Sequence, residues 1–114
     1  MTVFLLSPEQ EKTDWLPATD IYRAPWGWLL KFDIAGVRLG DVDVRVNRNT
    51  VAVSGIRRDY TVEEGCCHYS MEITYSRFQR TIELPDNLSG SQFRMDYRDG
   101  ILFVRIKREK GESK

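Results

Sequence analysis

Apolar and polar residues alternate along several short stretches of this chain. In residues 28–34 the apolar positions are Trp28, Leu30, Phe32 and Ile34. Residues 41–46 repeat the pattern with Val42, Val44 and Val46, separated by charged side chains. Successive side chains of a strand point to opposite faces of a sheet, so this period of two predicts strands that bury one face.

The stretch 93–106 is predicted to be a β-hairpin with a matched apolar face. Asp99-Gly100 is a strong turn signal, because a type I′ turn needs a positive φ at both central residues. Pairing the arms across this turn sets three pairs opposite each other: Tyr97 with Leu102, Met95 with Val104, and Phe93 with Ile106. A hairpin alone is marginal in water, so a second layer must cover this face.

Further strands are predicted at residues 20–24, 50–54 and 78–84, and turn residues recur at intervals of roughly eight to twelve. No stretch has the periodicity of a three-turn amphipathic helix. The predicted fold class is therefore all-β, an immunoglobulin-like β-sandwich.

The interval 56–77 is too long for a plain loop in a compact domain. Within it, Cys67, Tyr69, Met71 and Ile73 alternate with polar residues, which is typical of a strand. In the strand that follows, Arg80 shares a face with Phe78 and Ile82. A charge at that position must find a partner or reach the rim of the sandwich.

Composition sets the broad class of the protein. The chain has 114 residues, which is one domain, and its 17 basic and 17 acidic side chains cancel. This balance argues against nucleic acid or an anionic membrane as a bulk electrostatic partner. No apolar run is long enough to cross a bilayer, and the start lacks the basic flank of a signal peptide. The expected location is the cytoplasm.

The sequence offers little chemistry for catalysis. Cys66, Cys67 and His68 suggest a metal or a thiol nucleophile, but the single histidine leaves a zinc site short of ligands and a Cys/His pair without an orienting group. The alternative is that these cysteines simply pack on a strand. Without a Gly-rich phosphate loop or a Ser/His/Asp set, we expect no enzyme and no cofactor.

The order of five motifs resembles the α-crystallin domain of the small heat-shock proteins. These are Asp20-Ile21-Tyr22, Asp33-Ile34-Ala35-Gly36-Val37 with Asp41-Val42-Asp43-Val44, Val53-Ser54-Gly55-x-Arg57, Phe78-x-Arg80 to Leu84-Pro85, and Asp99-Gly100-Ile101-Leu102. The resemblance implies three parts: a short flexible N-terminal arm (1–19), the sandwich domain (20–108) and a charged tail (109–114). The arm would carry the apolar anchors Val3, Phe4, Leu5 and Trp15, unless these dock as a packed terminus.

The interval before Phe78 resembles the bacterial and plant branch, in which a strand in a long loop pairs with the first strand of a partner. The resemblance therefore implies a homodimer by strand exchange. Its interface residues would be Ile21, Tyr22, Cys67, His68, Tyr69, Met71 and Arg80.

By the same resemblance, the protein is an ATP-independent holdase that binds partly unfolded client proteins and limits their aggregation. The client groove would be lined by Val42, Val44, Val46, Phe93, Met95 and Leu102. The competing interpretation of these residues is core, and it is the better one for Val44 and Leu102. The alternative function is a co-chaperone or scaffold of the CS-domain type, which docks on a larger chaperone.

Three residues depart from the family pattern: Ala35 replaces a usual Pro, Ser76 a usual Gly and Met95 a common Ala. The tail also lacks an Ile-x-Ile pair, and the arm is short. We therefore expect dimers or small oligomers, with Val3 and Leu5 as a possible ligand of the groove.

Overall fold

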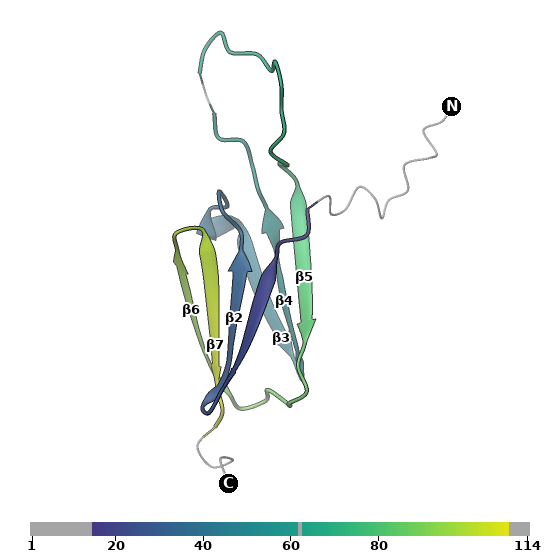
Figure 1. The fold of residues 1–114 in the computed structure, drawn as a ribbon, viewed down its shortest axis with the longest axis vertical. Coiled ribbons are helices and arrows are strands. Elements are labelled where there is room, and N and C mark those ends of the chain that lie inside the picture. The colour runs from purple at the N-terminus through teal and green to yellow at the C-terminus, as the bar shows by residue number, and fades with distance from the viewer. Residues whose placement is uncertain (1–14, 62, 110–114) are drawn as a thin grey trace, which may run out of the picture.

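The computed structural model describes residues 15–61 and 63–109. Two antiparallel sheets pack face to face (Figure 1). The larger has the order β1 (Thr19–Ala24), β2 (Gly27–Asp33), β7 (Ile101–Lys107), β6 (Gln92–Arg98). The smaller has the order β3 (Val42–Asn47), β4 (Thr50–Ile56), β5 (Arg77–Glu83). The described residues contain no α-helix, only a 3-10 turn, η2 (Leu39–Asp41), so the predicted all-β sandwich is confirmed.

The hairpin formed by β6 and β7 has the predicted register. Tyr97 pairs with Leu102, Met95 with Val104, and Phe93 with Ile106. The turn residues Asp99 and Gly100 have φ values of 54° and 78°, as a type I′ turn requires. The sequence-based prediction of this hairpin is therefore confirmed to the residue.

The core lies between the two sheets and is built from the inward positions of the central strands. Those of the larger sheet are Trp28, Leu30, Phe32, Leu102, Val104 and Ile106. Those of the smaller sheet are Val51, Val53, Phe78 and Ile82. Burying each such side chain contributes about 2 kcal/mol to folding, so this alternation of apolar residues determines which face of each strand turns inward.

The turn between β1 and β2 is fixed by close backbone contacts. Gly27 has a φ of 148°, and a Cβ atom there would collide with the Ile106 carbonyl oxygen. Arg108 adds two hydrogen bonds to this turn: its backbone N–H donates to the Trp26 carbonyl (2.9 Å) and its guanidinium to the Pro25 carbonyl (2.8 Å). Trp26 is therefore held at a defined place on the surface.

The chain between β4 and β5, residues 57–76, leaves the sandwich as an extended loop and contains no strand (Figure 1). The alternation of residues 67–74 is thus not realised as a strand in the single chain. A strand needs a neighbour to hydrogen-bond its backbone, and none is available where the loop lies.

Candidate functional site

Each sheet ends in two outer strands. At one end of the sandwich Trp15, which precedes β1 in the chain, forms a parallel bridge with Phe78 of β5. The other outer strands are β6 of the larger sheet and β3 of the smaller one. Val46, Phe93 and Met95 are 39%, 36% and 49% exposed there, while Val42 and Val44 are half-buried.

We call these five residues the β3/β6 edge surface. It combines exposed apolar side chains with strand edges that have no neighbour among the described residues. Leu102, assigned to the same groove by resemblance, is only 1% exposed and belongs to the core. The reason is its place on β7, an interior strand whose inner face the smaller sheet covers.

The edge of β1 is a second exposed strand. Ile21 and Tyr22 are 45% and 46% exposed, although both lie within a paired strand. β2 covers only one edge of β1, so the N–H and C=O groups of its other edge can accept another strand. Lys31 approaches the Tyr22 hydroxyl at 3.5 Å from the neighbouring strand.

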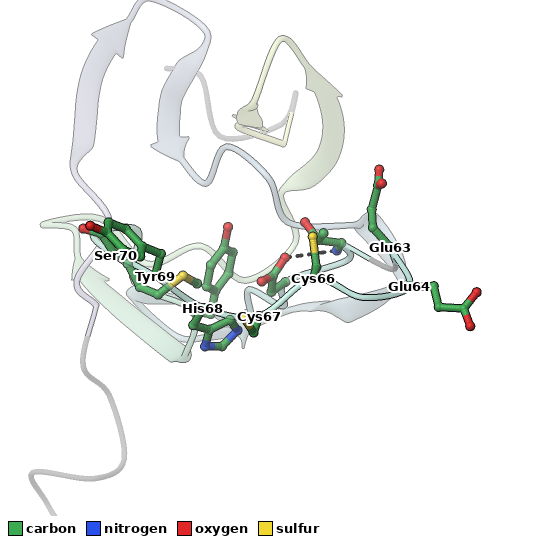
Figure 2. Close-up of a pocket in the computed structure, with 11 residues that line it drawn as sticks. Glu63, Glu64, Cys66, Cys67, His68, Tyr69 and Ser70 are labelled. Atoms are coloured by element: carbon green, nitrogen blue, oxygen red, sulfur yellow. Dashed lines mark hydrogen bonds between the residues drawn. The ribbon is translucent and has the colours of Figure 1, made fainter.

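The protruding loop holds the remaining residues predicted at the interface. Tyr69 is completely exposed and Met71 is 48% exposed, and Cys67 and His68 are exposed as well. Figure 2 shows residues of this loop, from Glu63 to Ser70, along an open pocket of about 810 Å³. A group of large apolar side chains that is exposed in the single chain commonly marks a surface that another molecule covers.

The base of this loop is held by Arg57. Its Nε donates to the Thr74 carbonyl (2.9 Å), its NH1 donates to the Ala35 carbonyl (3.1 Å), and its backbone N–H donates to the Ser76 carbonyl (2.9 Å). The guanidinium also stacks on the Trp15 ring, 3.6 Å from the ring centroid. One side chain thus ties the loop to the segment that precedes β1.

Arg80, a residue of β5, holds the same segment that precedes β1. Its NH1 donates to the Pro17 carbonyl at 2.9 Å, and Pro17 is buried. In the single chain the partner of Arg80 is therefore a backbone carbonyl of its own chain, where the sequence predicted a charge-paired contact. A further role of Arg80 at a dimer interface stays a prediction.

Tyr60 joins the first turn of the loop to the start of β3. Its hydroxyl donates to the Asp41 carboxylate at 2.7 Å, and Arg58 Nε lies 3.3 Å from the same carboxylate oxygen. The hydrogen bond from Tyr60 is the main reason that the pKa of Asp41 is lowered, and it raises the pKa of Tyr60 in turn. Sequence reasoning missed these contacts because the partners are 17 to 19 residues apart and share no local pattern.

Residues 15–61 and 63–109 contain no group of three or more His, Cys, Asp or Glu side chains that could hold a metal ion. Within the same ranges, no helix is long and apolar enough to span a membrane.

The described residues thus present two strand edges with exposed apolar side chains, and a protruding loop follows β4. A profile of the Hsp20/alpha crystallin family matches residues 20–114. The chain belongs to this family. The match covers every strand of the sandwich and the whole loop, so the resemblance recognised from the sequence motifs is confirmed.

Individual members of the Hsp20/alpha crystallin family share about three residues in ten with this chain. Small heat shock protein C2 of Rickettsia felis is 28% identical over 87% of this chain and 65% of its own length. The 17.7 kDa class II heat shock protein of Arabidopsis thaliana is 32% identical over 76% of this chain and 57% of its own length. The chain thus spans about three fifths of the length of these curated relatives.

Solved structures of small heat-shock proteins share the fold. HSP18.5 of E. histolytica superimposes with a TM-score of 0.71 at 28% identity, covering 82% of this chain and 88% of that one. Heat shock protein 16.0 of Schizosaccharomyces pombe gives 0.73 at 24% identity, covering 88% and 94%. A small heat-shock protein of Xylella fastidiosa, described as having a distinct high order structure, gives 0.67 at 21% identity, covering 83% and 87%.

Proposed function

We propose that this protein is an ATP-independent chaperone that binds partly unfolded client proteins and limits their aggregation. The observation that carries the proposal is the β3/β6 edge surface, where exposed Val46, Phe93 and Met95 lie on outer strands that have one free edge among the described residues. An extended client segment can add to such an edge by backbone hydrogen bonds while its apolar side chains cover the exposed ones. The family membership supports this activity.

The proposed assembly is a homodimer by strand exchange. The loop segment 67–72 has the alternation of a strand, but no strand of residues 15–61 and 63–109 pairs with it. Within the same ranges β1 has one free edge, with Ile21 and Tyr22 exposed. Pairing the loop of one chain with β1 of another would satisfy both backbones and cover Tyr69 and Met71.

In this proposal the parts of the chain keep the roles expected from the sequence: an arm at 1–19, the sandwich at 20–108 and a charged tail at 109–114. Val3, Phe4 and Leu5 of the arm lie outside the described residues, and so does the tail from residue 110. The proposed location is the cytoplasm, and stress that unfolds other proteins would create the clients.

Heating an aggregation-prone client with and without this protein, in the absence of nucleotide, tests the proposed activity. We expect light scattering to fall at roughly equimolar protein. A variant with Val46→Ser and Met95→Ser removes exposed apolar surface and should suppress aggregation less. The matched control, Asp43→Ser with Arg45→Ser, changes two exposed residues of β3 without altering net charge.

The control should protect the client as the parent protein does, and thermal melting should confirm that both variants fold. If the parent leaves scattering unchanged across several clients but binds a larger chaperone, the protein is an adaptor of the CS-domain type. If both variants protect the client as well as the parent does, clients bind elsewhere than at the β3/β6 edge surface.

A further inference from the structure

The outer face of the larger sheet carries a concentration of positive charge. In the register of β2, β7 and β6, this face holds five cationic side chains: Lys31, Arg94, Arg98, Arg105 and Lys107. Asp33 and Asp96 are the acidic residues of the same three strands. The chain as a whole is neutral, so this excess of cations is local.

Two of these cations are directly opposite each other. Arg94 of β6 pairs with Arg105 of β7, and like charges at such positions destabilise a sheet. Asp96 offsets only part of this charge, because one carboxylate is shared between Arg105 at 4.0 Å and Arg98 at 3.9 Å. Among residues 15–61 and 63–109, Arg94 and Lys107 have no carboxylate within ion-pair distance. A sequence that tolerates such a conflict commonly does so at a functional site.

An exposed aromatic ring stands beside these cations. Trp26 is 37% exposed and is positioned by the two hydrogen bonds from Arg108 described above. Trp26, Arg94, Arg105 and Lys107 together line a cavity of about 330 Å³, which we call the Trp26 pocket. It lies on the opposite face of the larger sheet from Phe93 and Met95 of the β3/β6 edge surface.

We propose that the Trp26 pocket binds an acidic segment of another polypeptide. A carboxylate between Arg94 and Arg105 would separate the two like charges and accept hydrogen bonds from both guanidinium groups. An apolar side chain next to that carboxylate would pack on the Trp26 ring. Ligand binding would then provide negative charge beside Arg94 and Lys107, where the described residues place no carboxylate within ion-pair distance.

The charges elsewhere on this sheet face favour a short peptide over a long polyanion. Asp20, Asp33 and Asp96 lie on the same sheet face and would repel an extended phosphate backbone or an anionic bilayer. The cavity has room for a few side chains rather than for a long tract. A short segment with two or three carboxylates therefore fits both the size and the charge of the site.

Calorimetric titration of the protein with an acetylated, amidated peptide, Ser-Glu-Glu-Phe-Glu-Ser, tests the proposal. We expect saturable one-site binding that weakens as salt is raised. The peptide Ser-Gln-Gln-Phe-Gln-Ser has the same shape without charge and should bind at least about tenfold more weakly. A single-stranded oligonucleotide and phosphatidylserine vesicles serve as the competing anions.

Arg94→Gln separates a binding role from a structural one. It should weaken peptide binding about tenfold, and because it removes the like-charge pair, it should leave the Tm of the free protein unchanged or raised. The matched control is Arg45→Gln, another exposed arginine on an outer strand, whose Nε hydrogen-bonds Asp43 at 2.6 Å. This control should bind the peptide as the parent does.

Absence of saturable binding, equal affinity for the uncharged peptide, or tighter binding of the oligonucleotide or the vesicles would overturn the proposal. So would equal affinity of Arg94→Gln and the parent. A Tm for Arg94→Gln below that of Arg45→Gln would show that Arg94 stabilises the sheet instead. The client assay uses different variants, so either proposal can fail without the other.

Discussion

Arg80 shows how a charged residue is accommodated beside a core. It shares a strand face with buried Phe78 and Ile82 and reaches the Pro17 carbonyl at the edge of the sandwich. We expect Arg80→Ala to lower the free energy of unfolding by about 1.5–3 kcal/mol, because a hydrogen bond from a charged donor is lost and Pro17 remains buried.

Urea unfolding followed by circular dichroism measures this loss. Gln79→Ala is the control, since Gln79 is the exposed neighbour of Arg80 on the same strand. If both variants unfold at the same urea concentration, the bond to Pro17 contributes nothing and Arg80 merely lies along the rim.

Arg57 and Arg58 are adjacent arginines with very different surroundings. Arg57 reaches two carbonyls and the Trp15 ring, whereas Arg58 makes a single ion pair with Asp41 at 3.3 Å. A lysine cannot reproduce the planar fork of arginine. Arg57→Lys should therefore speed hydrogen exchange of the backbone amide at position 57, which donates to the Ser76 carbonyl, while Arg58→Lys should leave exchange at that position nearly unchanged. Equal exchange in the two variants would contradict the role of Arg57 at the loop base.

At the level of elements, the loop is the part whose removal is most informative. Replacing residues 61–70 with a short Gly/Ser turn should yield monomers, because it removes residues 67–70 of the proposed exchange strand 67–72. The sandwich should melt within a few degrees of the parent, since none of the core residues lies in the loop. Light scattering coupled to size exclusion measures the mass, and a variant that remains dimeric at micromolar concentration would show that exchange is not what holds the chains together.

The elements also show what the sequence can predict. The strand β2 and the β6–β7 hairpin were predictable because each has strict alternation, and the hairpin also has a turn that only certain residues adopt. The segment 67–74 has the same alternation but no strand in the single chain, since a strand depends on a partner that local sequence does not specify. Leu102 shares the inner face of its hairpin with Met95 but is buried, because β7 is interior and β6 is an edge.

The contacts at the loop base were beyond prediction for another reason. Arg57 meets Ala35 and Thr74, which are 22 and 17 residues away along the chain. Such contacts arise only after both sheets are assembled. Periodicity therefore predicts faces of strands well and predicts long-range polar contacts poorly.

For the whole molecule, a protein of these 114 residues should form dimers or small oligomers. Its tail at 109–114 has no aliphatic residue with which to enter the edge of a neighbour. Val3 and Leu5, two apart and hence on one face when extended, are the candidates for that contact. Size exclusion with light scattering should show no stable species of about twelve or more chains, and Val3→Ser with Leu5→Ser should shrink any oligomer larger than a dimer. An unchanged mass distribution would exclude the arm as the ligand.

The protruding loop also has a consequence for the lifetime of the protein in a cell. The loop has Arg58 and Arg77 at its base and a fully exposed Tyr69 at its middle. An exposed, extended backbone of this kind can bind in the active site of a protease. In the proposed dimer the partner covers this segment, so a chain without a partner is the one degraded. Degradation would then remove chains that have no partner and set a lower limit to the concentration at which this protein persists in the cell. Limited proteolysis with chymotrypsin, which cleaves after aromatic residues, should show cleavage after Tyr69 that becomes faster per chain as the protein is diluted. A rate independent of concentration would mean that no partner protects the loop.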